Sequence, residues 1–73
     1  MDFLKTHPPA RLLRSPVAEL KAYDGVKFIS QDTSWLMLRG SGTEPILRIY
    51  AEARTNADVE KLLTLGLRLT KRV

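Results

Sequence analysis

Cysteine is absent from this chain of 73 residues, and histidine occurs only once. Without thiols, neither a disulfide framework nor a thiolate metal site can stabilise so small a domain. The single histidine excludes a multi-histidine metal centre, and a Ser-His-Asp triad would have to rest on it alone. Because His7 stands directly before Pro8-Pro9, in a segment expected to be a loop, the sequence argues against a catalytic role for it.

Long apolar runs are also missing, so the sequence predicts no membrane-spanning segment, and Met1-Asp2 does not resemble the start of a signal peptide. We therefore expect a cytoplasmic protein with no membrane partner. The composition, 44% apolar and 27% charged, is typical of one small globular domain. A net charge of +4 suits an anionic partner, although a solvated basic face is the commoner cause of such a surplus.

The beginning of the chain carries few signals for regular structure. Residues 1–6 are too few for an independent helix, although Phe3-Leu4 could complete a helix that begins upstream. Three prolines predict that most of 7–16 is irregular. They are Pro8, Pro9 and Pro16. We interpret 1–16 as a helix remnant followed by a proline-rich segment, and 17–73 as the folded domain.

Four strands are expected downstream, joined as an antiparallel meander. Asp24-Gly25 lies between two short runs and is a strong hairpin signal, because both residues tolerate positive φ. A second polar turn is expected at 31–34. The segment 46–53 alternates between apolar and polar residues, which is the period of a half-buried strand. The expected strands are 17–22, 26–29, 35–38 and 46–53.

A helix is expected to close the chain. Thr55 is a good N-cap residue, and Asp58 follows three positions later as in a capping box. Apolar residues then recur at helical spacing, and Gly66 among them would let the helix backbone approach the sheet. Lys71-Arg72 suit the negative end of the helix dipole. The expected fold class is α+β, with a four-stranded antiparallel sheet packed against a C-terminal helix.

One loop between the last two strands gathers donors for an oxyanion, most plausibly a phosphate. Arg39 offers a planar fork that can engage two phosphate oxygens and stays charged at any relevant pH. Ser41 and Thr43 add hydroxyl donors, while Gly40 and Gly42 allow backbone N–H groups to turn inward. The full segment reads Arg39-Gly40-Ser41-Gly42-Thr43-Glu44-Pro45.

The other residues of the loop have supporting positions. Pro45 restricts Glu44 to an extended conformation, and the Glu44 carboxylate should point away from a bound anion, toward Arg48 or a backbone amide. On composition alone, an ordinary polar connection explains the segment equally well. It is not a P-loop, because no Lys-Ser or Lys-Thr follows the second glycine and a strand follows in place of a helix.

The segment 39–45, with Arg48 and the run 50–52, resembles the signature of the C-terminal domain of the α-D-phosphohexomutases, a family that includes phosphoglucomutases and phosphomannomutases. The runs 24–28 and 34–36 also resemble the family's approach to this loop. Many spaced elements match in order, which makes an accidental similarity improbable. One departure is Gly40, where many relatives have proline, so that ordering this loop on a ligand should cost more entropy.

The resemblance implies a TATA-binding-protein-like domain of order βαββββα, here lacking its first strand and most of its first helix. It also implies a parent enzyme of four domains, in which a phosphoserine exchanges its phosphoryl group with a hexose phosphate, assisted by magnesium that another domain holds. The last domain holds the phosphate that is not being transferred. By that analogy, Arg39, Gly40, Ser41, Gly42 and Thr43 contact the phosphate, and Glu44, Pro45 and Arg48 support them. No catalytic or metal-ligating residue is implied for this chain, which alone is predicted to be inactive.

Alternation places Arg39 on the same sheet face as Trp35 and Met37, opposite Leu36 and Leu38. This face could be an interdomain contact surface, but we favour ordinary surface aromatics or cover by the N-terminal segment. A small nucleic-acid-binding module is the main alternative function, with the sheet aromatics Trp35 and Tyr50 as stacking platforms. The sequence disfavours it, because the basic residues are not interleaved with these aromatics. A remnant with only an interaction role is a third possibility.

Overall fold

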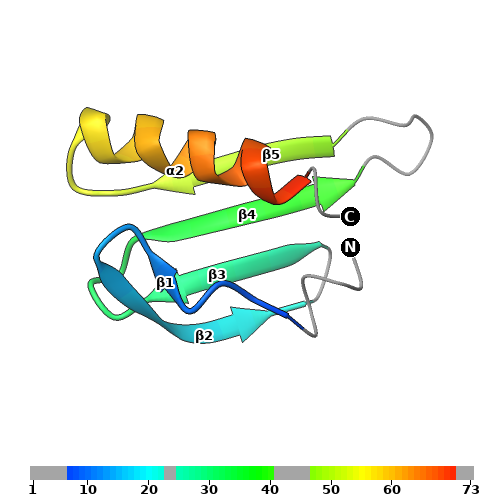
Figure 1. Ribbon diagram of the computed structural model, residues 1–73, viewed down its shortest axis with the longest axis horizontal. Coiled ribbons are helices and arrows are strands. Elements are labelled where there is room, and N and C mark those ends of the chain that lie inside the picture. The colour runs from blue at the N-terminus through cyan, green and yellow to red at the C-terminus, as the bar shows by residue number, and fades with distance from the viewer. Residues whose placement is uncertain (1–6, 23–24, 41–46, 71–73) are drawn as a thin grey trace.

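The computed structural model describes residues 7–22, 25–40 and 47–70, and in this part of the chain five strands precede one helix (Figure 1). The sequence signals at Phe3-Leu4, Asp24 and Lys71-Arg72 fall outside the described residues. No helix in the described part has the length and apolar character needed to cross a bilayer. The elements are β1 (Arg11–Leu12), β2 (Ser15–Lys21), β3 (Val26–Ser30), β4 (Trp35–Gly40), β5 (Leu47–Glu52) and α2 (Asn56–Thr70).

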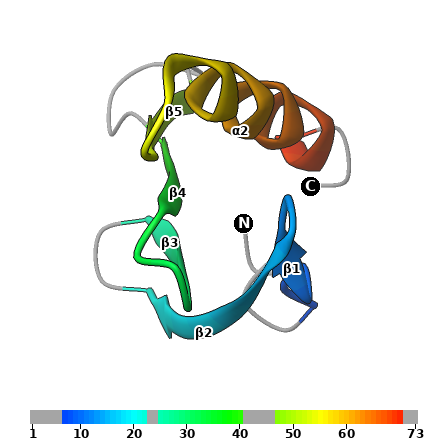
Figure 2. The ribbon, with the colours of Figure 1, turned by 90° about the vertical axis from the view of Figure 1, so that its left-hand side faces the viewer.

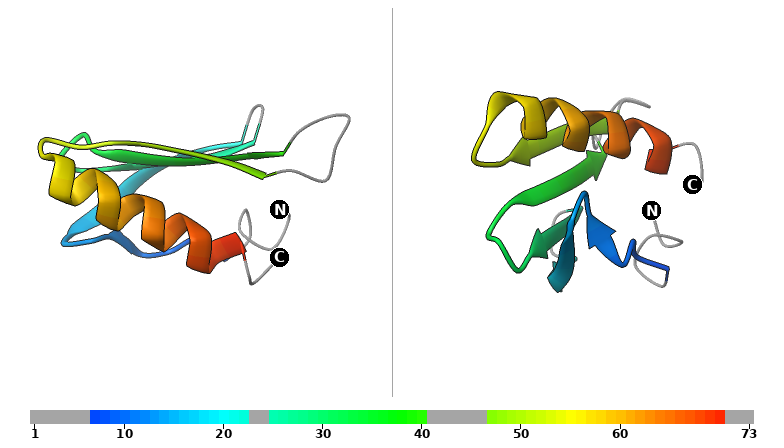
Figure 3. Two further views of the ribbon diagram at one scale, coloured as in Figure 1. Left: turned by 90° about the horizontal axis from the view of Figure 1, so that it is seen from above. Right: turned by 60° about the vertical axis from the view of Figure 1, so that its left-hand side comes forward.

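The five strands form one antiparallel sheet in chain order, so each strand pairs with its neighbour in sequence. Helix α2 packs on one face, against β4 and β5, and no described element covers the opposite face of these strands (Figure 3, left). The sheet curls, which brings β1 round toward the side of the helix (Figure 2). The predicted α+β class, the antiparallel meander and the closing helix are confirmed, whereas the TATA-binding-protein-like topology stays a prediction.

The predicted number of strands was wrong, because β1 and the start of β2 lie within 7–16, which was expected to be irregular. Leu13 and Arg14 form a two-residue turn between these strands. The turn lacks a glycine or asparagine signal, and Leu13 adopts a left-handed backbone conformation (φ 58°) that leucine rarely takes. Pro16 is tolerated in β2 because it contributes its carbonyl, which accepts a 2.9 Å hydrogen bond from the Gln31 N–H.

Alternation along the central strands builds the core beneath α2. Leu36 and Leu38 on β4 are fully buried, whereas Trp35 and Met37, which alternate with them, are half-buried on the other face. This confirms that Arg39 points away from the core-facing leucines. The buried apolar side chains are Leu12, Val26, Phe28, Leu36, Leu38, Leu62 and Leu69.

Two sequence features fix the helix on the sheet. The Asp58 N–H donates to Thr55 Oγ1 at 3.1 Å, which confirms the predicted N-cap. Gly66 is buried against the sheet, and a Cβ at this position would lie 2.7 Å from Cγ2 of Ile49 and 3.3 Å from Cδ1 of Leu36. The predicted close approach of the helix backbone is therefore confirmed.

We expect Gly66→Ala to lower the free energy of unfolding by about 1 kcal/mol in a urea titration. The methyl group overpacks the core, typically at a cost of about 1–3 kcal/mol, which exceeds the gain of about 1 kcal/mol in helix propensity. Thr64→Ala, on the exposed side of the same helix, is the matched control and should not destabilise the domain. A stabilised Gly66→Ala variant would contradict the close packing described here.

Candidate anion-binding site

The predicted site is divided between described and undescribed residues. Arg39 and Gly40 end β4, and Arg48 is the second residue of β5. These three residues therefore lie on the two strands that the predicted phosphate loop connects, at one end of the sheet (Figure 1). The remaining predicted contacts lie outside the described residues, namely Ser41, Gly42, Thr43, Glu44 and Pro45.

Arg39 and Arg48 occupy directly opposing positions on neighbouring strands. Both side chains are exposed, and both belong to the sheet face that α2 does not cover. Side chains that oppose each other across an antiparallel pair have Cβ atoms about 5 Å apart, so the two arginine side chains start close together on one face of the sheet. Such a like-charge pair is unfavourable by itself and favours a bound anion.

Sequence reasoning named both arginines but did not place them opposite each other. The length of the connecting segment does not fix the pairing register, and only the observed pairs Gly40 with Leu47 and Arg39 with Arg48 establish it. Gly40 itself has no described atom within 4 Å of the position that a Cβ would occupy. The flexibility of glycine is therefore not required there by crowding among the described residues.

The same face continues away from the arginines as an aromatic surface with fixed polar partners. Trp35 Nε1 donates to Glu52 Oε2 at 2.9 Å, and the Lys27 ammonium lies 4.3 Å from the Trp35 ring centroid. Tyr50, next to Met37 across the strands, is 39% exposed. A cation already covers the indole, so a stacking base would have to displace Lys27.

A second polar cluster lies at the opposite end of β4, in the turn that sequence analysis expected at 31–34. Ser34 Oγ donates to the Asp32 carboxylate at 2.5 Å, and the Ser34 N–H donates to it at 3.0 Å. The buried Ser30 hydroxyl also lies within 2.5 Å of this carboxylate. Hydrogen bonds from Ser30 and Ser34, with a smaller contribution from the charge of Arg54, lower the pKa of Asp32 from 3.8 to about 2.

This second cluster has a structural role that its contacts explain. The Asp32 N–H donates to Ser15 Oγ at 3.1 Å, which ties the turn to the start of β2. The Asp32 carboxylate satisfies donors of the turn itself, as in an Asx-turn. The described residues contain no group of three His, Asp or Glu side chains that could hold a metal ion.

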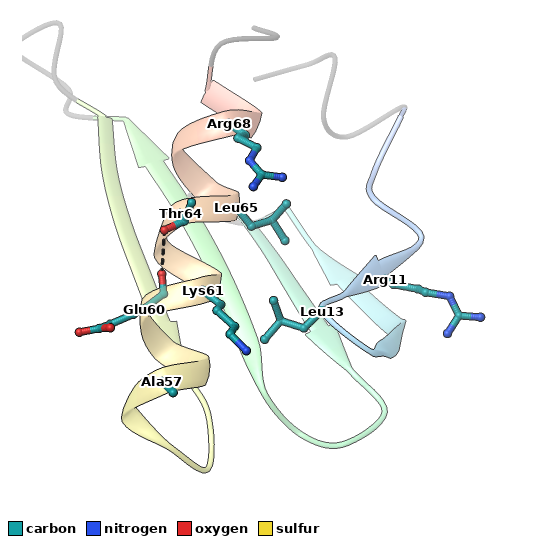
Figure 4. Close-up of a pocket in the computed structure, with 8 residues that line it drawn as sticks. All are labelled: Arg11, Leu13, Ala57, Glu60, Lys61, Thr64, Leu65 and Arg68. Carbon is teal, nitrogen blue, oxygen red and sulfur yellow. Dashed lines mark hydrogen bonds between the residues drawn. The ribbon is translucent and has the colours of Figure 1, made fainter.

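An open cavity of about 660 Å³ lies between α2 and the β1–β2 turn (Figure 4), and neither Arg39 nor Arg48 lines it. Lys61 and Leu65 of the helix point toward Leu13 of the turn. Its described lining side chains are exposed apart from the half-buried Leu65, so they do not form a fixed set of phosphate donors. The lining residues are Arg11, Leu13, Ala57, Glu60, Lys61, Thr64, Leu65 and Arg68.

Comparison with known sequences assigns the family. The model of the phosphoglucomutase/phosphomannomutase C-terminal domain matches residues 10–64, which include the strands, the loop and most of the helix. The chain belongs to this family. The match begins before β1, so the family's domain includes this short strand, whose residues lie in the segment that was expected to be irregular.

Three relatives of the chain are named as mutases, and their names mention different sugars. A phosphoglucomutase/phosphomannomutase of Thermococcus kodakarensis is 43% identical over 73% of the chain, and a phosphoglucosamine mutase of Methanococcus aeolicus is 41% identical over 74%. A phosphopentomutase of Thermococcus kodakarensis is 33% identical over 86%. The chain spans only 12%, 12% and 14% of the lengths of these relatives, respectively. No solved structure matches significantly.

The Asp32 network predicts a specific loss of stability in acid. The pKa of Asp32 is about 2 in the folded domain, below its ordinary value of 3.8. The contribution of Asp32 to the free energy of unfolding is therefore present above pH 3.8 and disappears as the pH falls toward 2. Asp32→Asn should remove this part of the pH dependence, measured as the urea midpoint between pH 5 and about pH 2.

Glu60→Gln is the matched control, because it removes one negative charge from an exposed position on α2. It should retain the loss of stability that Asp32 causes in acid. If Asp32→Asn and the unmodified chain lost stability in parallel over this range, the Asp32 carboxylate would not be held by the hydrogen bonds described here.

Proposed function

We propose that this domain binds the phosphate of a hexose phosphate that is not being transferred, as part of a larger phosphohexomutase. In the parent enzyme, other domains would carry the phosphoserine, the magnesium site and the groups that recognise the sugar. This chain would supply anion binding alone and would be inactive without them. A cytoplasmic location agrees with this role and is part of the proposal.

The observation that carries the proposal is the opposed pair of Arg39 and Arg48 at the two ends of the loop. An anion bound there would lie against two exposed guanidinium groups on one face of the sheet. Guanidinium groups can bind phosphate oxygens in a bidentate manner, and binding would relieve the repulsion between the two cations.

The loop sequence supplies the donors that would complete this site. Ser41 and Thr43 would donate their hydroxyls, and the glycines at 40 and 42 would let backbone N–H groups face the phosphate. The sequence of 39–45 contains no histidine, cysteine or lysine, which agrees with binding and positioning in place of chemistry. Glu44, Pro45 and Arg48 would hold the loop at its exit into β5.

Family membership supports the class of ligand but leaves the sugar open. The relatives include proteins named as phosphoglucomutase/phosphomannomutase, phosphoglucosamine mutase and phosphopentomutase. All these names share a sugar phosphate, and they differ in the sugar. We therefore assign the common phosphate group to this domain and propose that other domains select the sugar.

An NMR titration with inorganic phosphate and with glucose 1-phosphate tests the proposal. Amides of residues 40–43 should shift selectively at millimolar ligand, which corresponds to a binding free energy of about −4 kcal/mol. Arg39→Ala should abolish the shifts. Arg39→Lys should bind with intermediate affinity, because it keeps the charge and loses the bidentate fork.

Arg68→Ala is the matched control, since it removes an exposed arginine from α2 and leaves strands β4 and β5, which carry Arg39 and Arg48, unchanged. It should titrate like the unmodified chain. Equal loss of binding in Arg68→Ala and Arg39→Ala would indicate only a nonspecific effect of net charge. Salt-dependent binding of single-stranded oligonucleotides with quenching of Trp35 would instead support the nucleic-acid alternative.

Arg48→Gln should have opposite effects on stability and on binding. Without phosphate, it removes a like-charge cross-strand pair and should raise the free energy of unfolding by about 0.3 kcal/mol. With phosphate, it should weaken binding severalfold and reduce the stabilisation that the ligand provides. Urea titrations with and without phosphate measure both effects, and unchanged stabilisation by phosphate would remove Arg48 from the site.

A further inference from the structure

Gly25 lies beside the strand end that carries Arg39. Val26 pairs with Leu38 in the antiparallel β3–β4 ladder, so the residue before Val26 lies next to the residue after Leu38. Arg39 therefore has Gly25 on one side and Arg48, its partner in β5, on the other. The sequence pointed to Gly25 as part of a hairpin turn and of the run 24–28 that resembles the family, and it gave no sign of the contact between Gly25 and β4.

The contact between Gly25 and β4 leaves no room for a side chain. A Cβ on Gly25 would lie 2.5 Å from the Leu38 carbonyl oxygen, 3.1 Å from Cα of Arg39 and 3.2 Å from Cβ of Arg39. Two of these atoms belong to the backbone, so they cannot move aside by a change of rotamer. Gly25 also has a φ of 126°, a backbone conformation that L-residues with a side chain rarely adopt.

The backbone of Gly25 consequently limits where the end of β4 can lie. Any atom added at Gly25 would push the backbone of Leu38 and Arg39 away. The Leu38 side chain is fully buried in the core, which restrains Leu38. The displacement would therefore fall mainly on Arg39, which is exposed and is followed by the loop. A guanidinium fork must be placed accurately to bind two oxygens of one phosphate.

We propose that Gly25 is a positioning residue for the phosphate site: its bare backbone packs against Leu38 and Arg39 and sets the position from which the Arg39 side chain reaches the anion. This inference rests on the proposed function, because it assigns Gly25 to the site through Arg39. Gly25 itself does not contact the phosphate. Gly25, which directly precedes β3, thus supports the end of β4 that carries Arg39.

A comparison of two glycine substitutions separates positioning from stability. Gly25→Ala and Gly66→Ala each place a methyl group in a crowded position, but Gly66 contacts Ile49, Leu36 and Leu38 side chains in the core and not Arg39. We expect Gly25→Ala to weaken phosphate binding at least about tenfold, while Gly66→Ala stays within about twofold of the unmodified chain. NMR titration gives the affinity, and urea titration gives the stability of each variant.

The apo spectra provide a further readout that a purely structural role would not move. Gly25→Ala should shift the backbone amide of Arg39 and the side-chain Nε–H signal of Arg39. Gly66→Ala should leave the Arg39 Nε–H signal in place, even when the two variants are equally destabilised. Titrations are compared at a temperature where urea unfolding shows both variants to be more than nine-tenths folded, at about 1.4 kcal/mol of stability or more.

The unmodified chain gives a test that remains available if Gly25→Ala does not fold. If Gly25 and Arg39 are coupled, phosphate should slow amide hydrogen exchange at Val26 as well as at Arg39. Exchange at Gln31 and Asp32, at the opposite end of the sheet, should not change. Protection of Arg39 without any effect at Val26 would overturn the positioning role.

The outcomes distinguish this inference from the proposed function. If the unmodified chain binds phosphate and Gly25→Ala binds it equally well, the positioning role is wrong and the phosphate site stands. If Gly25→Ala and Gly66→Ala lose affinity in proportion to their loss of stability, Gly25 has only a structural role. If the unmodified chain does not respond to phosphate at all, the proposed function fails, and the positioning role fails with it.

Discussion

Burial of Leu36 and Leu38 beneath α2 decides the orientation of every other side chain on β4. Because successive residues of a strand point to opposite faces, these leucines can be buried only if Arg39 points to the uncovered face. A register slip of one residue would expose the leucines and direct Arg39 into the core, where a charge is very costly. The hydrophobic core thus fixes the face on which an anion can bind.

The packing of α2 depends in turn on Gly66, which lets the helix lie close to Ile49 and Leu36. The sheet consequently has a packed face, which provides stability, and an open face, which carries the two arginines. The family model of the C-terminal domain matches residues 10–64, so both faces of the sheet belong to a domain of this family. A domain that supplies only part of a binding site is expected to bind weakly alone.

At two of the three described glycines, the backbone lies so close to a neighbouring segment that a side chain would not fit. These two contacts lie in different parts of the molecule. Gly66 admits the helix to the core, whereas Gly25 admits a turn to the end of β4. Gly40, within the predicted site, is not crowded by any described atom. The described glycine that packs closely against Arg39 is therefore Gly25, which lies outside the segment 39–45.

Local sequence determined the antiparallel strands, the Asp-Gly hairpin, the Thr55 cap and the period of the helix, because hydrophobic alternation and turn chemistry act over a few residues. It also named Arg39 and Arg48 as members of one site. It missed β1, since the Leu13 turn has no glycine signal and is held by pairing with β2. Only tertiary structure decided that Arg39 has Arg48 on one side and Gly25 on the other, because strand register depends on contacts between segments far apart in the chain.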